Sequence, residues 1–227
     1  MRVVIMGGTS GIGLATARLL AGDGSEVTVT GRDPGRLAAV PAPIGTERLD
    51  GTDRAAVTEF FDRIGEFDHL VLAFSPGPVG FAPLRDLTPE DLQTAFSGKL
   101  FAYLHAIARA QVTRSITMIS AVSARAAEPG TVALAAVNGA IERVVSPLAA
   151  ELAPVRVNAV SPGFVDTPWW SSFPEEQRAA AYEQGAAAVP MKRVGRPEDV
   201  AGAIAYLLNA DFVTSSVLPV DGGFSIA

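Results

Sequence analysis

Short apolar runs alternate along this chain with longer segments of helical composition. Residues 2–6 form the first run, whose β-branched residues and following glycines are typical of a buried strand. The same pattern predicts strands over residues 2–6, 26–30, 46–49, 68–73, 115–120, 155–160 and 216–220. It predicts helices over residues 11–20, from residue 34 onward, and over 54–64, 88–110, 131–152 and 198–208. Alternation of this kind indicates right-handed βαβ units. We therefore expect a single doubly wound, Rossmann-type α/β domain over residues 1–227, with a mostly parallel sheet flanked by helices on both faces.

Composition and charge exclude several classes of protein. Hydrophobic residues make up 48% of the chain, which is enough apolar surface to offset the entropy of folding. The net charge of −6, with no run of Lys or Arg, argues against a nucleic-acid partner. The absence of cysteine and the presence of only two histidines exclude thiolate catalysis and predict no metal site. We find no apolar run of the ~20 residues that cross a membrane. The first strand begins at residue 2, so we expect no signal peptide and a cytoplasmic protein.

The turn after the first predicted strand is rich in glycine. It is Gly-Gly-Thr-Ser-Gly-Ile-Gly over residues 7–13, and it opens a predicted helix. Glycines allow a tight turn and a close approach of the backbone to a ligand, and a helix N-terminus offers free N–H groups to a pyrophosphate. The spacing G-x-x-x-G-x-G in this context predicts a dinucleotide site.

Together with later motifs, this turn makes the chain similar to the short-chain dehydrogenase/reductase family over essentially its whole length. The matching motifs are Asp50 after the third strand, Ser161-Pro162-Gly163 after the sixth, Thr167, and the late segments 193–200 and 220–223. The resemblance implies that Asp50 contacts adenine, that residues 161–163 lie against the nicotinamide, and that Thr167 touches the phosphate or carboxamide region. The residues expected at the cofactor are Gly7, Thr9, Ser10, Gly11, Ile12, Gly13, Arg32, Asp50, Asn138, Pro162, Gly163, Val165 and Thr167.

The end of the second strand favours NADP(H) over NAD(H). A carboxylate there would accept hydrogen bonds from a ribose 2′-hydroxyl and repel a 2′-phosphate. This chain has Gly31 at that position and Arg32 next to it, and a guanidinium pairs well with a phosphate. Thr30 and Ser10 could add hydroxyl donors. Asp33 is a counter-argument, but its place before Pro34 suits a helix cap.

The resemblance also implies a catalytic Ser, Tyr and Lys, with an Asn in the preceding helix. This chain has other residues at all four positions. Tyr and Lys belong four residues apart on one helix face. The only lysines are Lys99 and Lys192, and no tyrosine has a lysine four residues later, so no shift of the alignment restores the pair. The Asn, Ser, Tyr and Lys positions are occupied by Ser97, Ala121, Leu134 and Asn138, respectively.

Three interpretations of this replacement remain open. The first is an NADP(H)-dependent oxidoreductase that acts on a small, apolar carbonyl, enone or imine with a non-standard proton source. An iminium substrate would need no proton at all. The second is an inactive relative that binds NADPH as a sensor or partner subunit. The third is a non-redox isomerase or dehydratase, which no residue positively supports. The candidate proton sources are Ser97, Ser123, Tyr103, Lys99 or an ordered water, and we take Ser97, Ser123 and Asn138 as candidate catalytic residues.

Residues 164–190, which we name the lid segment, correspond to the family's substrate lid. Five aromatic residues lie between positions 164 and 182, and both tryptophans of the chain are among them. They predict an apolar ligand, with Phe164, Trp169 and Trp170 as candidate substrate residues; alternatively, they pack a subunit interface or the underside of the lid itself.

Two further expectations concern helices. Lys99 follows Ser97 by two residues and so points about 200° away from it on an α-helix, which predicts a surface or interface position. The helices predicted at 96–110 and 131–152 resemble the pair that forms the family's dimer interface. We therefore expect a homodimer or homotetramer.

Overall fold

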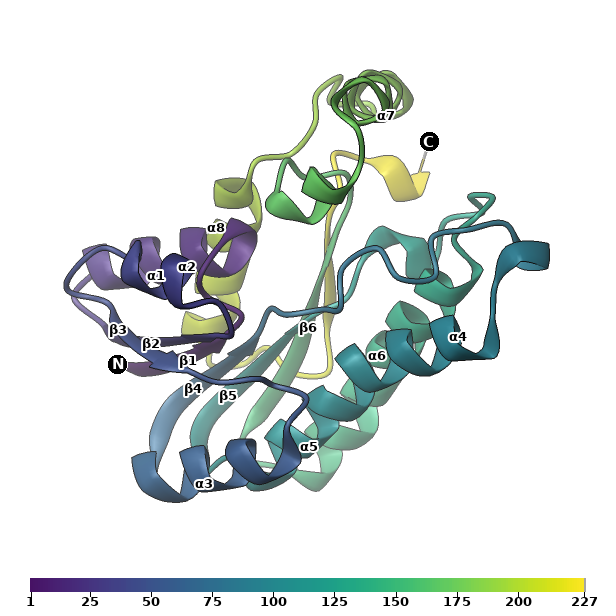
Figure 1. The fold of residues 1–227 in the computed structure, drawn as a ribbon. Helices are drawn as coiled ribbons and strands as arrows, with labels where there is room; N and C mark the ends of the chain where they lie inside the picture. Colours follow the sequence, from purple (N-terminus) through teal and green to yellow (C-terminus); the bar gives the residue numbers. More distant parts are fainter. Residues whose placement is uncertain (227) are drawn as a thin grey trace.

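In the computed structural model, which describes residues 1–226, all seven strands belong to one sheet (Figure 1). Every neighbouring pair is parallel. The order is β3-β2-β1-β4-β5-β6-β7, so the direction of winding reverses between β1 and β4. The predicted doubly wound parallel sheet is confirmed. The strands are β1 (Arg2–Met6), β2 (Glu26–Gly31), β3 (Gly45–Arg48), β4 (Phe67–Leu72), β5 (Val112–Ile119), β6 (Arg156–Pro162) and β7 (Val217–Val220).

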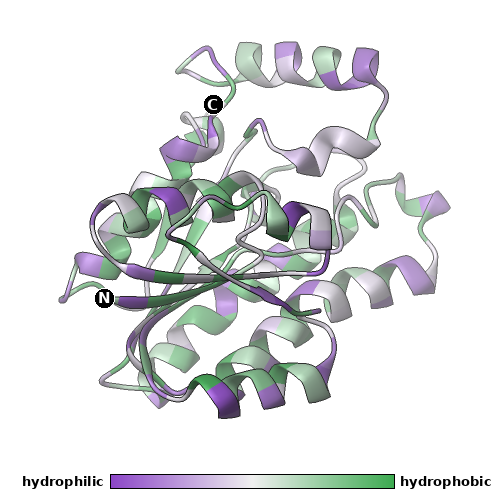
Figure 2. Ribbon diagram, turned by 60° about the vertical axis from the view of Figure 1, so that its left-hand side comes forward, coloured by the Kyte–Doolittle hydropathy of each residue, from purple (hydrophilic) through white to green (hydrophobic). Residues whose placement is uncertain are grey.

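Helices cover both faces of the sheet. They are α1 (Gly11–Gly22), α2 (Pro34–Ala38), α3 (Arg54–Ile64), α4 (Pro89–Ala95), α5 (Ala102–Arg109), α6 (Val132–Glu151), α7 (Glu175–Ala188) and α8 (Pro197–Asn209). Val3 and Ile5 of β1 pack with α1 and α8, whereas Val4 and Met6 pack with α3, α5 and α6. This alternation follows from the two-residue period of a strand. Figure 2 accordingly shows hydrophobic colour along the strands and on the helix sides toward the sheet.

Two helical segments differ from the prediction. The helix expected over 88–110 is divided into α4, a π-helical turn at Phe96–Phe101 and α5. Helix α7, inside the lid segment, was not predicted at all. Its only buried residue is Gly185, so no apolar stripe marks it in the sequence.

Helix α6 corrects the expectation that no segment is long and apolar enough to cross a membrane. It has 20 residues, and its most apolar window has a mean hydropathy of 1.3. One such helix is weak evidence for a membrane span, because the core helices of soluble proteins meet the same criterion. Here a third of that window is buried, and Val137, Ile141 and Val145 belong to the core on one face of the sheet.

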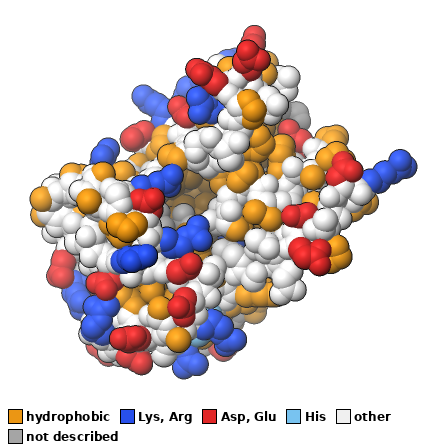
Figure 3. Space-filling model, in the orientation of Figure 1, with side chains coloured by type: hydrophobic (Ala, Val, Ile, Leu, Met, Phe, Trp, Pro, Cys, Tyr) orange, Lys and Arg blue, Asp and Glu red, His pale blue; other side chains and the backbone are white. Residues whose placement is uncertain are grey.

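The carboxyl ends of the strands meet at one edge, beneath the part of the chain that carries α7 (Figure 1). The space-filling view shows the surface hollowed there, with basic and apolar side chains at the rim (Figure 3). In open parallel sheets, ligands bind at this edge where the winding reverses. The candidate site therefore lies around the ends of β1, β4, β5 and β6.

Candidate active site

The glycine turn after β1 forms a cradle that side chains would fill. Gly7 and Gly11 have φ values of 85° and 51°, a region that favours glycine. A Cβ atom on Gly13 would lie 2.3 Å from the carbonyl oxygen of Gly7. Ser10 is the N-cap of α1, and its side chain makes no capping hydrogen bond, so the first N–H groups of α1 are open to a ligand. This arrangement fits a pyrophosphate at the helix N-terminus.

The wall opposite the turn comes from the chain after β6. A Cβ atom on Gly11 would lie 3.3 Å from the Cβ atom of Thr167, so these two predicted cofactor residues face each other closely. At the end of β6, which includes Pro162, the N–H of Gly163 donates to the carbonyl of Val220 at 3.1 Å. The structure thus brings the glycine turn and the segment after β6 to the same cleft.

A backbone neck closes the stretch between Val165 and Gly195, which contains most of the lid segment. Val165 and Gly195 form a parallel bridge. The N–H of Gly195 donates to the carbonyl of Phe164 at 2.8 Å, and the N–H of Asp166 donates to the carbonyl of Gly195 at 2.9 Å. The stretch between these two residues therefore leaves and rejoins the body of the protein at nearly the same place.

Arg32, after β2, and Asp50, after β3, lie together, with a guanidinium nitrogen 3.8 Å from a carboxylate oxygen. Asp50 also accepts hydrogen bonds from the N–H and the hydroxyl of Thr52. Partial burial opposes ionisation, but these two bonds and the charge of Arg32 hold the pKa of Asp50 below its usual value. The Arg32 side chain is 66% exposed, so its guanidinium has donors to spare for a phosphate.

A chain of three polar side chains leads from the core toward the end of β5. The Lys99 ammonium donates to Oδ1 of Asn138 at 2.6 Å and to the carbonyl of Ser120 at 3.4 Å. Nδ2 of Asn138 donates to the hydroxyl oxygen of Ser123 at 3.1 Å. Lys99 and Asn138 are 8% and 3% exposed, whereas Ser123 is half-buried. Burial lowers the pKa of Lys99 to about 7.

Lys99 is therefore not a surface or interface residue, and that prediction was wrong. The angle of about 200° holds for a regular α-helix, whereas Ser97 and Lys99 both lie in the π-helical turn, from which Lys99 faces α6. Ser97 instead donates its hydroxyl to the carbonyl of Gln93 within its own helix. A signal was present in the sequence: Lys99 stands alone among the apolar residues 98–102.

Tyr103, Ala121 and Leu134 offer no proton donor to the cleft. Tyr103 is fully buried and donates to the carbonyl of Phe74 at 2.9 Å, and burial raises the pKa of its phenol above the usual value. Ala121 and Leu134 are half-buried and bring no polar side-chain atom to the cleft. Of the candidate hydroxyl groups, only that of Ser123 is joined by hydrogen bonds to both Asn138 and, through it, Lys99.

The aromatic residues of the lid segment pack mainly on one another. The ring of Trp170 stacks on Phe164, with centroids 5.6 Å apart, and meets Trp169 edge-on at 4.8 Å. Phe173 meets Phe81, from the loop after β4, edge-on at 5.8 Å. Sequence reasoning missed Phe81, whose contact joins the lid segment to the opposite rim of the cleft. Trp169, Trp170 and Phe173 remain half-buried and can contribute apolar surface to a ligand.

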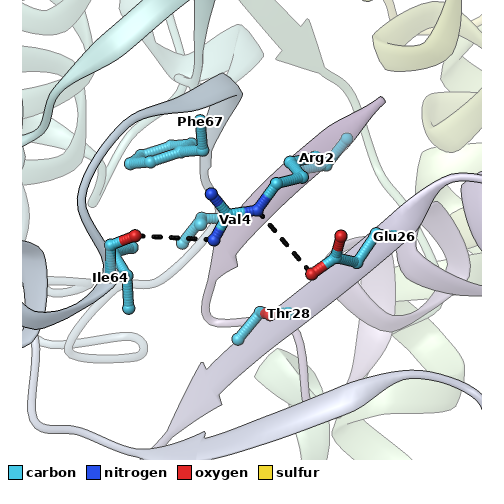
Figure 4. Close-up of a pocket in the computed structure, with 7 residues that line it drawn as sticks. Arg2, Val4, Glu26, Thr28, Ile64 and Phe67 are labelled. Carbon is cyan, nitrogen blue, oxygen red and sulfur yellow. Dashed lines mark hydrogen bonds and ion pairs between the residues drawn. The ribbon is translucent and has the colours of Figure 1, made fainter.

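The described residues also line cavities at two places. One, of about 20 Å³, is at the amino end of β1, where Arg2 pairs with Glu26 at 3.7 Å (Figure 4). It has room for roughly one water molecule. The other, of about 300 Å³, lies between Phe164, Met191 and residues 219–223, and Arg193 and Asp199 form an ion pair in its wall. Within residues 1–226, no three His, Cys, Asp or Glu side chains are placed to hold a metal ion.

Known proteins share both this sequence pattern and this fold. A family model described as enoyl-(acyl carrier protein) reductase matches residues 7–225. The short-chain dehydrogenase/reductase ATR9 of Stachybotrys chlorohalonatus is 32% identical, over 97% of this chain and 95% of the relative. The 3-oxoacyl-(acyl-carrier-protein) reductase MabA of Mycobacterium tuberculosis is 31% identical, over 99% and 92%.

A solved small-chain dehydrogenase in complex with NADPH superposes with a TM-score of 0.88 at 29% identity, covering 100% of this chain and 99% of that one. The glycine cradle and the Arg32 side chain described above fit the same cofactor. The chain belongs to the short-chain dehydrogenase/reductase family and is an NAD(P)-dependent oxidoreductase of that type.

Proposed function

We propose that this oxidoreductase transfers hydride between NADP(H) and a small, apolar carbonyl, enone or imine substrate, and that Lys99, Asn138 and Ser123 replace the family's tyrosine and lysine. One observation carries the proposal: hydrogen bonds run outward from a buried ammonium group to a half-buried hydroxyl group in the 3₁₀ turn Val122–Ala124 after β5.

The direction of these hydrogen bonds is fixed by their donors. An ammonium group only donates, so the amide of Asn138 must turn its oxygen toward Lys99 and its NH2 group toward Ser123. The oxygen of Ser123 accepts this bond, and its hydrogen has no acceptor among residues 1–226. That hydrogen is available to the oxygen of a bound substrate. The charge of Lys99 polarises the amide and strengthens this donor.

When bound, NADPH supplies the hydride for reduction. As negative charge develops on the substrate oxygen, the hydroxyl of Ser123 donates to it and the charge of Lys99 stabilises it from behind. A serine hydroxyl is too weak an acid to protonate the product alone, so water at the half-buried mouth of the site supplies the proton. An iminium substrate would become a neutral amine without this proton.

The substrate class rests on the lid segment and on the relatives. Trp169, Trp170 and Phe173 offer an apolar, aromatic surface beside the cleft. The relative named as a 3-oxoacyl-(acyl-carrier-protein) reductase supports a carbonyl as the reacting group. We also propose a cytoplasmic homodimer or homotetramer, in which exposed apolar residues such as Phe101 and Val132 would be covered.

The test begins with titration of the protein by NADPH and NADH, followed by nicotinamide fluorescence. Apolar ketones, enones and imines are then screened for NADPH oxidation with wild type, Ser123→Ala and Ser97→Ala. The control is Ser146→Ala, on the distant half of α6. Loss of one donor to a developing oxyanion costs typically about 10²-fold in kcat. We expect such a loss in Ser123→Ala only.

The outcomes separate the interpretations. Tight NADPH binding without turnover on any substrate would favour the inactive binding protein. Turnover that falls in Ser97→Ala and not in Ser123→Ala would place the donor in the π-helical turn at Phe96–Phe101 and refute the proposed chain. Turnover confined to iminium substrates and unaffected by Ser123→Ala would assign hydride transfer without an oxygen-directed donor.

A further inference from the structure

Thr9 of the glycine turn occupies the space beside Gly31, at the end of β2. A Cβ atom on Gly31 would lie 2.6 Å from the methyl carbon of Thr9 and 2.9 Å from its hydroxyl oxygen. Real Cβ atoms do not approach other atoms this closely. Thr9 therefore prevents position 31 from holding any side chain while the turn keeps its present place.

Neither residue can easily move away. The carbonyl of Gly31 accepts from the N–H of Leu49 at 2.9 Å, which holds β2 to β3. The carbonyl of Thr30 accepts from the N–H groups of both Gly7 and Gly8, at 3.1 and 3.2 Å, which seats the turn on β2. Threonine carries both a methyl and a hydroxyl group on Cβ, so each staggered χ1 rotamer leaves at least one of them in a place beside position 31.

This contact lies where a protein of this fold distinguishes its cofactors. A carboxylate at the end of β2 would bind a ribose 2′-hydroxyl and repel a 2′-phosphate. In this chain the space holds the hydroxyl group of Thr9, which is half-buried and makes no hydrogen bond with the described residues. A hydroxyl can donate to a phosphate oxygen.

We propose that Thr9 and Gly31 act as one specificity determinant, in which Thr9 excludes a carboxylate from position 31 and offers its own hydroxyl to the 2′-phosphate. The preference for NADPH is thus set by a contact between two βα units, in addition to the charge of Arg32. A carboxylate introduced at position 31 alone collides with Thr9 and displaces the turn that holds the pyrophosphate. Removing the Thr9 side chain at the same time makes room for it.

The test compares Kd values for NADPH and NADH in wild type, Thr9→Gly, Gly31→Asp and the double variant, by nicotinamide fluorescence. We expect Gly31→Asp alone to weaken both cofactors at least 10-fold. We expect the double variant to bind NADH at least 10-fold more tightly than Gly31→Asp does, and to prefer it over NADPH. Thr9→Gly should still prefer NADPH, with a loss of a few-fold from the missing hydroxyl.

Matched variants without charge test the collision itself. Gly31→Ala adds only the Cβ atom, so it should lower the Tm, and Thr9→Gly should restore part of that loss. Such non-additivity is the signature of two side chains in contact. Additive changes in Tm would overturn the proposal, as would a Gly31→Asp variant that binds NADH well without any change at Thr9. The Tm measurements need no cofactor, so they decide on the contact separately from the affinities.

Discussion

Raising the pH from 7 to 9 should stabilise the folded chain, and replacement of Lys99 by Met should abolish that gain. Burial lowers the pKa of Lys99 to about 7 from its ordinary value of 10.5. Between these two values the unfolded chain holds a proton that the folded chain lacks. Stability rises with pH wherever the unfolded state binds more protons. Below pH 7 the folded chain bears the full free-energy cost of burying the charged Lys99. As the pH rises from 7 toward 10.5 the folded chain releases the proton, so this cost falls.

The expected size follows from the two pKa values. A difference of one bound proton changes the free energy of unfolding by roughly 1.4 kcal/mol per pH unit. Because Lys99 is only half deprotonated at pH 7, the gain between pH 7 and pH 9 comes to about 2 kcal/mol. Burial lowers the pKa of His69 to about 4, so His69 acts below this window. Tyr103 has a raised pKa, so it lowers stability only above about pH 10.

The assay is urea denaturation at pH 7, 8 and 9 with wild type, Lys99→Met and the control Lys192→Met. Lys192 is exposed, so its replacement should leave the slope with pH unchanged. Lys99→Met leaves Oδ1 of Asn138 without its hydrogen-bond donor. An unpaired buried polar atom should lower the free energy of unfolding by about 1–3 kcal/mol. The slope is therefore the measurement, not the absolute value. Equal stability of wild type at pH 7 and 9, or the same gain in Lys99→Met, would refute the reasoning.

Three further predictions concern binding and turnover. Gly13→Ala should weaken NADPH binding at least 10-fold, because its Cβ atom would lie 2.3 Å from the Gly7 carbonyl oxygen; fluorescence titration that shows wild-type affinity would contradict the cradle. For a carbonyl substrate, kcat of reduction by the wild type should fall as the pH rises through about 7, because Lys99 loses its charge in that range. In Lys99→Met, kcat should no longer depend on pH in this range; the same pH dependence in the variant as in the wild type would remove Lys99 from the mechanism. Phe173→Ala should raise KM for apolar substrates about 2–10-fold, the value of one aromatic contact, with Phe81→Ala giving the same change; an unaltered KM in both would separate this contact from substrate binding.

Local sequence signals were sufficient for most of the fold. Glycines 7–13, Pro34 after Asp33 and the Thr88 capping box each mark a helix start within a few residues, and β-branched runs mark the strands. Such signals could not predict that the side chain of Lys99 points into the core. Spacing gives the angle between two side chains only in a regular α-helix, and here the π-helical turn and its packing against α6 decide that Lys99 turns inward. The contact between Thr9 and Gly31 likewise depends on how two separate turns dock, and periodicity carries no information on that.

Because the backbone neck at Val165 and Gly195 holds its two ends together, the stretch between them can be replaced as a unit. Its two ends are held together by backbone hydrogen bonds that do not involve the side chains between them. The entropy of closing a loop grows slowly, by roughly 0.6 kcal/mol for each doubling of its length. Insertions, deletions or whole replacements between residues 167 and 193 should thus be tolerated by the sheet and the glycine turn. In such chimeras the apolar substrate surface can be altered while the sheet and the nucleotide cradle keep their shape.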